Sequence, residues 1–325
     1  MFDLPPQIEI LLCKDKIFEA LSNPFDLVNN HDQPVKMKDL YNGTVYQKFI
    51  ASLLPRTDDV RHISFCMSVD GASLYTSSTC QIWPLFVSIL ELPSRIRDHN
   101  LLLGGLWFSK THAKQVVFLI PFAKHCQKLS DNGFQIDVRG EIVHIKAHLL
   151  CCCADAPARA GVQGIHQHGG SFCCHWCLDP SANRKFAGLN YVPELRTQAE
   201  IIADGSAAMV MDGRDNNSVN GVTGLSPLLT VKTMDIVDGM VLEYFHACAH
   251  GIAKTFLSGW LGEDGCDKTI PYYIGTPLTL KELDGFMDST KLPKEARRPA
   301  RKLTENGKWK SPSAEFIAAH LSRSK

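Results

Sequence analysis

The sequence predicts an α/β protein, because apolar segments with the period of β-strands alternate with segments typical of helices. Residues 61–70, RHISFCMSVD, set apolar side chains at alternate positions, which is typical of a strand with one apolar face. Residues 141–155, EIVHIKAHLLCCCAD, read as a second strand, and ADAPARAGV then opens a helix. The two strands end in Asp70 and Asp155, at the position where open α/β sheets place their chemistry.

Further elements are expected along the chain. A helix is predicted from about Lys114 to Leu129, stopped by the turn Asp131-Asn132-Gly133. The segment from about Val237 to Trp260 also looks helical. Residues 82–92 and 101–108 are apolar enough to be buried.

Composition limits the classes of protein. With 325 residues, 45% apolar and 21% charged, the chain is typical of a soluble globular protein with one large domain or two ordinary ones. It has no run of about 18 apolar residues that could span a membrane, and MFDLPPQIEI lacks the pattern of a secretory signal. The 12 cysteines, three of them consecutive at 151–153, favour reduced thiols in the cytosol or nucleus. Because the formal net charge is zero, nucleic-acid binding would have to depend on local patches.

Asp70 and Asp155 each have a structural and a functional interpretation. Asp70-Gly71 is a common hairpin-turn dipeptide, and Asp155 suits the N-cap of the following helix, with Pro157 in its first turn. Their shared position at strand ends favours function, because two converging carboxylates would bind a divalent cation. Mg²⁺ prefers one or two carboxylates together with phosphate oxygens and water, the arrangement used in phosphodiester chemistry.

Cys174 and Cys177 form a C-x2-C pair in SFCCHWCLDP, which offers two of the four ligands of a structural zinc site. The best second pair is His246 and His250, four residues apart on one face of an expected helix. About 70 residues separate the pairs, so two buried thiols and two unrelated histidines stay an alternative. A redox role is less favoured, because the cysteines follow a glycine turn instead of opening a helix after a strand. The spare ligands are Cys173, His175 and Cys248.

A third acidic residue lies near the end of the chain. WKSPSAEFIAAHLSRSK reads as a helix with Ser311 as N-cap and Pro312 at its first position, which places Glu315 in its first turns. Its structural interpretation is an acid favoured by the helix dipole. Residues 291–310 hold eight basic residues against two acidic ones, which is typical of a solvated surface and also of a phosphate-binding patch.

Several motifs occur in one order along the chain: SVDGASLYTSSTCQIWPL, LLLGGLWFSK, CCADAPARAGV, FCCHWCLDP, the stretch from GVTGLSPL to EYFHACAHGIAK, PYYIG and WKSPSAEF. In this order they resemble the transposases of CACTA (En/Spm, Tnp2-type) DNA transposons, from about residue 37 to the end. The resemblance implies an RNase H-like fold with a DDE/D acidic triad that binds two Mg²⁺ (or Mn²⁺) ions.

The resemblance assigns the three acids. Asp70 matches the first acid, in the family's DG motif, and Asp155 the second, in its D-x-P-A-R motif. Glu315 is the candidate for the third, because the family places an acid after a Trp-Lys motif on the last catalytic helix. Arg159, one turn beyond Asp155, is expected either to contact backbone phosphate or to form a salt bridge with Asp155.

The resemblance also implies a structural Zn²⁺ ion. The family is related to the catalytic subunit of the V(D)J recombinase, which carries a C-x2-C pair and paired histidines in an insertion before its last acid. The corresponding ligands here are Cys174, Cys177, His246 and His250. Family members often have an apolar residue at the position of His250, and Cys248 is then the substitute ligand.

The implied organisation is a largely helical insertion within a catalytic core. The expected parts are an N-terminal segment, the first part of the core, the insertion with the Cys/His cluster and a truncated final helix, at residues 1–58, 59–170, 171–305 and 306–325. The implied function is metal-dependent DNA cleavage and strand transfer at transposon ends. The protein would act in the nucleus as a homo-oligomer, without a membrane partner.

Three interpretations follow for the chain as a whole. It stops ten residues after Glu315, where family members continue, and it shows no separate DNA-binding module, so we expect a catalytic core from a truncated copy or a partial gene model. The first interpretation is an active DNA-cleaving and joining enzyme. The second is a transposon-derived protein that keeps the fold and zinc site but only binds DNA or partners. The third is a fragment without a function of its own, which would be cytoplasmic.

Overall fold

The fold was obtained as a computed structural model, which forms two compact units, Met1–Val241 and Leu242–Lys325. Each unit is described by itself. The structure describes residues 1–29, 39–54, 59–73, 80–110, 114–180, 192–211, 217–261, 268–269, 271 and 273–289.

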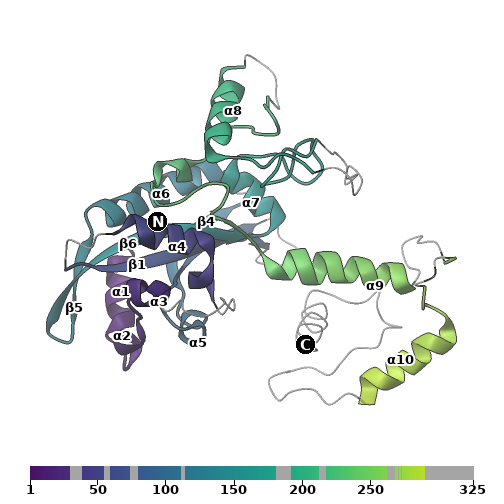
Figure 1. The fold of residues 1–325 in the computed structure, drawn as a ribbon, viewed down its shortest axis with the longest axis horizontal. Coiled ribbons are helices and arrows are strands. Elements are labelled where there is room, and N and C mark those ends of the chain that lie inside the picture. Colours follow the sequence, from purple (N-terminus) through teal and green to yellow (C-terminus); the bar gives the residue numbers. More distant parts are fainter. Residues whose placement is uncertain are drawn as a thin grey trace. The chain divides into compact units, whose positions relative to one another are not determined.

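The first unit contains both helices and strands (Figure 1). Its helices are α1 (Pro5–Leu12), α2 (Ile17–Ala20), α3 (Pro24–Asn29), η1 (Leu40–Asn42), α4 (Thr44–Ser52), α5 (Ser94–Arg97), α6 (Gln115–Asp131), α7 (Ala156–Gln163), α8 (Gln198–Val210) and η2 (Pro227–Thr230). Its strands are β1 (Arg61–Val69), β2 (Ala72–Ser73), β3 (Gln81–Ile89), β4 (Leu102–Ser109), β5 (Phe134–Val138), β6 (Glu141–Ala154) and β7 (Met240–Leu242), the last of which ends at the first residue of the second unit.

The seven strands of the described residues form one mixed sheet. Its central path runs β2-β3-β1-β6-β5, with β4 paired to β3 and β7 paired to β6. Strand β1 pairs antiparallel with β3 on one side and parallel with β6 on the other, so β1 and β6 lie side by side at the centre (Figure 1). A parallel pair needs a crossover between its strands, and here α6 supplies it.

The main elements expected from the sequence are confirmed. The predicted strands correspond to β1 and β6, the predicted central helix to α6, and the helix after Asp155 to α7. The two apolar segments form β3 and β4. The chain is therefore an α/β protein, as predicted.

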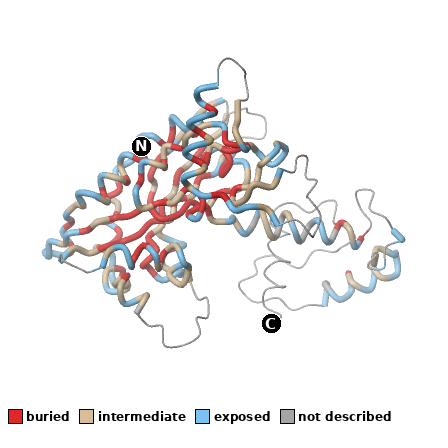
Figure 2. Tube along the Cα trace, turned by 45° about the horizontal axis from the view of Figure 1, so that its top comes forward, coloured by how far each residue is buried: buried red, intermediate tan, exposed pale blue. Residues whose placement is uncertain are grey.

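Strand β1 is buried on both of its faces. Ile63, Phe65, Met67 and Val69, at most 1% exposed, belong to the larger of two hydrophobic clusters, together with side chains of α1, α6 and β6. A second cluster packs Tyr46, Phe49 and Ile50 of α4 against Leu90, Leu150 and Cys151. Figure 2 shows the buried residues running along the strands. The second cluster and Phe25 of α3, whose ring packs edge-on against His62, cover the second face, so the alternate polar residues His62 and Ser64 are also buried.

A stacked pair of imidazoles occupies this second face. Nδ1 of His62 lies 3.0 Å from Nε2 of His148, and the two rings are nearly parallel with centroids 5.2 Å apart. Nδ1 of His148 lies 2.8 Å from Oγ of Ser130, and its ring contacts Phe49. Burial, and next the nearby His62, lower the pKa of His148 from 6.5 to about 3. The ring is therefore neutral at physiological pH.

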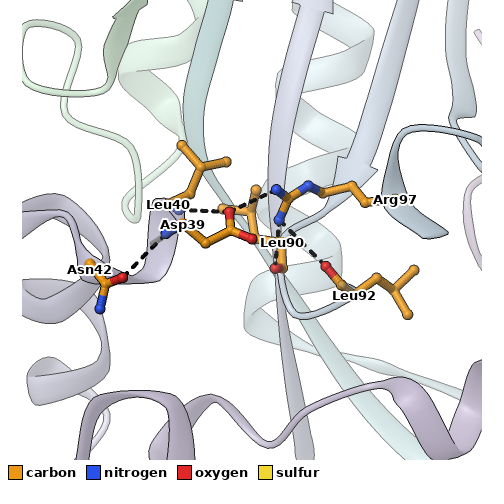
Figure 3. A network of polar contacts seen from close by, with 6 residues as sticks. All are labelled: Asp39, Leu40, Asn42, Leu90, Leu92 and Arg97. Atoms are coloured by element: carbon orange, nitrogen blue, oxygen red, sulfur yellow. Dashed lines mark hydrogen bonds and ion pairs between the residues drawn. The ribbon is translucent and has the colours of Figure 1, made fainter. Parts of the chain in front are cut away.

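A buried arginine joins the segment before α4 to the end of β3 (Figure 3). Arg97 of α5 donates from Nη1 to the carbonyl oxygens of Leu90 (3.1 Å) and Leu92 (3.4 Å), and from Nη2 to Oδ1 of Asp39 (2.7 Å). Asp39 in turn accepts from the backbone of Leu40 at 2.7 Å. The pair is shielded from water, since only 9% and 15% of the Arg97 and Asp39 side chains are exposed.

A buried carboxyl group makes a second polar connection between α4 and the sheet. Glu91 accepts from the hydroxyl of Tyr46 and the backbone N–H of Ser64, both at 2.8 Å, and from the hydroxyl of Ser64. Burial raises the pKa of Glu91. These groups are compensated by hydrogen bonds, so they fix the position of α4 instead of weakening the core.

The helix predicted from Val237 to Trp260 begins later than expected. Residues 240–242 form β7, which pairs with β6, and the helical residues follow as the π-helix η3 (Phe245–Ala253) and α9 (Lys254–Leu261). The backbone N–H of Cys152 donates to the carbonyl of Gly239 at 2.8 Å, and a Cβ on Gly239 would lie 2.7 Å from the carbonyl of Leu150. The missing side chain of Gly239 therefore allows the close approach that adds β7 to the sheet.

The second unit is helical in its described residues. It contains η3, α9 and α10 (Pro277–Ser289), and the backbone N–H of Ile274 donates to Trp260 at 2.7 Å. Among all residues described, no helix has the length and apolar character needed to cross a bilayer.

Substitution of His148 should change how stability depends on pH. Between pH 6.5 and 3 the unfolded chain takes up a proton at His148 that the folded chain does not, so stability falls as the pH falls through this range. In His148→Gln we expect the slope of unfolding free energy against pH to drop by about 1.4 kcal/mol per pH unit.

Urea unfolding between pH 4 and 6.5 measures this slope. His144→Gln, at an exposed histidine on the same strand, is the matched comparison. An unchanged slope in His148→Gln would show that His148 is protonated in the folded chain.

Candidate metal centre

The two predicted aspartates lie at matching positions on neighbouring strands. In the parallel register of β1 and β6, Ser68 pairs with Cys153. Asp70 and Asp155 each follow two residues later, so both lie at the same level at the carboxyl edge of the sheet. By this register the first two acids of the sequence prediction follow the ends of two adjacent strands, and their role as metal ligands stays a prediction.

The chain does not turn at Asp70. The pairing of β1 with β3 reaches Val69 opposite Leu85, and the pairing of β2 with β3 resumes with Ala72 opposite Ile82, at the same offset. Asp70 therefore continues in the direction of β1. The hairpin-turn interpretation of Asp70-Gly71 is wrong, and the Asp70 side chain is exposed at the strand end.

A proline explains why β1 ends at this point. The backbone N–H of Leu90 donates to Ser64 at 2.9 Å, and hydrogen-bonded pairs recur at every second residue of an antiparallel ladder. By this register Asp70 lies opposite Pro84, which has no N–H to donate. The hydrogen-bond ladder between β1 and β3 is thus interrupted beside Asp70.

The next residue, Gly71, lies under an aromatic ring. A Cβ on Gly71 would lie 2.5 Å from the ring of Trp83, so only glycine fits there.

Asp155 is the N-cap of α7, as the structural interpretation predicted. Its Oδ1 accepts from the backbone N–H of Ala158 at 2.8 Å, and Pro157 lies in the first turn. The cap engages one oxygen, whereas a carboxylate offers lone pairs on two. Capping and metal binding are therefore compatible at Asp155.

The third predicted acid, Glu315, lies outside the described residues. Among the described residues, no group of three or more His, Cys, Asp or Glu side chains is arranged to hold a metal ion. The described part of the site is thus the pair Asp70 and Asp155.

Arg159 contacts an aromatic ring. The residue is 5% exposed, and its guanidinium carbon lies 4.8 Å from the ring centroid of Trp176. Its Nη1 donates a weak hydrogen bond to the carbonyl of Ala154 at 3.5 Å, and its Nε has no hydrogen-bond partner in the described part of the chain. The ion pairs resolved among the described residues do not include one between Arg159 and Asp155. The predicted salt bridge is therefore not formed.

The loop that carries Cys174 and Cys177 is closed by Arg196. This buried side chain donates from Nε to the carbonyls of Cys174 (3.0 Å) and Cys177 (3.2 Å), and from Nη2 to those of Phe172 (2.7 Å) and Asn220 (2.8 Å). One guanidinium thus satisfies four carbonyl groups of an irregular loop. Sequence reasoning missed Arg196, because nothing in its local sequence distinguishes it from a surface arginine.

His175 is bound within the fold. Its Nδ1 lies 2.6 Å from Oε1 of Gln163, whose Nε2 donates to the carbonyls of His175 (3.2 Å) and Ile236 (2.8 Å). Burial, followed by the positive charges of Arg159 and Arg196, lowers the pKa of His175 to about 3. Both His175 and Gln163 are buried, so His175 contributes to the packing of the loop against α7.

The thiols of Cys174 and Cys177 interact with each other. Partial burial, and then a hydrogen bond with Cys174, raise the pKa of Cys177 to about 11. Both residues are half-buried, with their carbonyls engaged by Arg196. Two neighbouring thiols on a fixed loop are a donor set that fits a thiophilic cation, which would bind with release of the protons.

The predicted histidine ligands belong to the second unit. His246 is exposed, and Glu243 accepts both from its backbone N–H (2.6 Å) and at its Nδ1 (2.7 Å). Glu243 therefore caps the helix and orients the imidazole, as carboxylates do for many metal-bound histidines. His250 follows four residues later within η3, and its side chain is outside the described residues. The four-ligand zinc site stays a prediction.

Comparison with known proteins identifies the region that carries these residues. The family described as "Transposase family tnp2" matches residues 36–194, which include both aspartates and the Cys174–Cys177 pair. No curated protein matches the chain. The match of residues 36–194 to this family supports a relationship to CACTA-type transposases.

Proposed function

We propose that this chain is the catalytic region of a transposase that cuts and joins DNA by a two-metal DDE/D mechanism on an RNase H-like core. The observation that carries the proposal is the level placement of Asp70 and Asp155 at the ends of the paired strands β1 and β6. The strand arrangement supports it, because an antiparallel series β1-β3-β4 is followed by a helix and by a strand that returns parallel to β1. DNA is the expected partner of a protein in this family.

Asp70 and Asp155 would hold the metal ions in this proposal. When bound at these carboxylates, Mg²⁺ would supply Lewis acidity to the reacting oxygens of a phosphodiester. Asp70 is exposed and reaches solvent, where a DNA strand could approach. Asp155 is held in place through its cap bond to Ala158. Glu315 is our candidate for the third ligand, and an active complex is expected to be a homo-oligomer.

We further propose a structural zinc ion bound by Cys174, Cys177, His246 and His250. The paired thiols and the orientation of His246 by Glu243 support it. With four protein ligands, the ion would leave no open position for a substrate. Its function would be to hold together the residues that follow the core.

Asp70→Asn tests the catalytic proposal directly. Asparagine keeps the size of the side chain but removes the charge that would bind Mg²⁺, so nicking of supercoiled DNA with Mg²⁺ or Mn²⁺ should be lost while the melting temperature stays within a few degrees. Asp98, exposed after α5 at the far end of β3, provides a matched control in Asp98→Asn, which should nick as the wild type does. Undiminished nicking by Asp70→Asn would remove Asp70 from the mechanism.

Two substitutions at Asp155 separate its capping role from its role as a ligand. Asparagine caps helices about as well as aspartate, so Asp155→Asn should keep the stability of the wild type. Asp155→Ala removes the cap and should cost about 1 kcal/mol of unfolding free energy. Both variants should lose nicking and Mn²⁺ binding, measured by calorimetric titration. If Asp155→Asn nicks normally and only Asp155→Ala is impaired, Asp155 is an N-cap alone.

Metal analysis of cysteine and histidine variants tests the zinc proposal. Purified wild-type protein should hold about one zinc per chain, and Cys174→Ser should hold none, because three ligands bind zinc more weakly than four. Cys13→Ser, at the end of α1, is the control and should keep its zinc. Comparing His250→Ala with Cys248→Ser identifies the fourth ligand, since only loss of a true ligand releases the ion. Wild-type protein free of zinc, when purified without chelators, would end the proposal.

A further inference from the structure

One face of α7 connects Asp155, at the N-terminus of the helix, to the loop of Cys174 and Cys177. Asp155, Arg159 and Gln163 follow one another at intervals of four residues, and such residues share a helix face. Asp155 caps the helix, Arg159 contacts Trp176, and Gln163 binds His175. The first residue of this face is a proposed metal ligand, and the other two hold the residues between the cysteines.

The contact between Arg159 and Trp176 is built into the interior. Trp176 is itself fixed, since its Nε1 donates to the carbonyl of Met240 at 3.2 Å. Arg159 is 5% exposed, and its Nε is buried without a hydrogen-bond partner among the described residues. A buried guanidinium loses much of its hydration, and the aromatic face returns part of that free energy as a cation–π interaction. Because burial of the guanidinium costs free energy, we expect the placement of Arg159 to serve a function.

The same burial argues against a direct DNA contact by Arg159. A phosphate contact needs a guanidinium whose donors reach solvent, whereas this side chain lies between Trp176 and the carbonyl of Ala154. Ala154 is the last residue of β6 and directly precedes Asp155. Arg159 therefore contacts the end of β6, directly before Asp155, and the ring of Trp176 in the loop.

We propose that Arg159 is a positioning residue that couples the loop of Cys174 and Cys177 to Asp155. Its guanidinium lies over the ring of Trp176 and makes a weak hydrogen bond to the carbonyl of Ala154, so it links the loop to the backbone from which Asp155 projects. The functional part rests on the proposed role of Asp155 as a metal ligand. The loop would then support the metal centre through α7, in addition to any zinc that it binds.

Hydrogen exchange of the free protein tests the coupling without reference to activity. In Arg159→Met, which keeps the apolar stem and removes the guanidinium, amides in residues 156–163 should exchange about threefold faster or more. Trp176→Leu should give the same change, and Trp176→Phe, which keeps an aromatic face, should restore most of the protection. The double variant of Arg159→Met and Trp176→Leu should add little to either single change, because both remove one interaction. Unchanged exchange in β1 and β3 reports that the fold is kept.

Metal dependence then tests the functional part. Half-maximal nicking should need about threefold more Mn²⁺, or more, in Arg159→Met, with a smaller change in the rate at saturating Mn²⁺. Arg139→Met, at the turn between β5 and β6, is the control and should match the wild type. Wild-type protein that shows no metal-dependent nicking would overturn the proposed function, and the exchange experiment would still decide the coupling.

Two results would overturn the proposal. One is normal exchange of residues 156–163 in both Arg159→Met and Trp176→Leu. The other is a loss of DNA affinity in Arg159→Met with a salt dependence reduced by about one charge and an unchanged Mn²⁺ requirement, which would make Arg159 a phosphate contact.

Discussion

The parallel pairing of β1 with β6 is the constraint on which the rest of this structure depends. This pairing joins residues 61–69 to residues 141–154. Because the two strands run in the same direction, the chain between them has to return to the other end of the sheet, and α6 lies in that connection. The pairing shifts register by one residue between Phe65 and Cys66. After this shift, Met67 and Val69 pack into the main core, and the same register places Asp70 level with Asp155. In this last part of β1 a further shift by one residue would reverse the faces and move the acids out of level, so core packing and the proposed metal centre favour the same register.

Polar groups are buried on the second face of the sheet, and they have a structural function there. The pair His62 and His148, the Glu91 carboxyl and Arg97 each have hydrogen-bond partners, so their desolvation is offset within the fold. An apolar interface could form in several similar arrangements, whereas these bonds need defined geometry. They therefore orient α4 and the segment around Asp39 on the sheet, at the end of β1 opposite to Asp70.

Local pattern was sufficient to predict the elements that local physics controls. Alternating apolar residues identified β1, and an Asp-x-Pro sequence after an apolar run identified the capped start of α7. The sequence pattern was misleading where a neighbouring strand determines the backbone conformation. Asp-Gly reads as a turn, but Pro84 on β3 and the ring of Trp83 determine that the chain stays extended there. Likewise the partner of Arg159 lies seventeen residues away at Trp176, beyond the helical neighbours that a sequence pattern can identify. Glu315 and the side chain of His250 lie outside the described residues, so their proposed roles stay predictions.

Asp155 shows how one side chain can serve both the helix and the metal centre. A helix N-terminus carries partial positive charge, which favours a carboxylate but opposes a cation placed beside it. The cap bond to Ala158 turns one oxygen of Asp155 toward the helix. The second oxygen of Asp155, together with the carboxylate of Asp70 on the neighbouring strand, would hold a cation in the proposed mechanism, and their negative charge would offset the helix dipole. This geometry requires that the first turn of α7 stays where the strand pair places it.

A helix of eight residues has little stability of its own, so its position depends on side-chain contacts further along the same face. Arg159 and Gln163 make those contacts with Trp176 and His175. The residues between the two cysteines thus help to hold the helix that Asp155 caps.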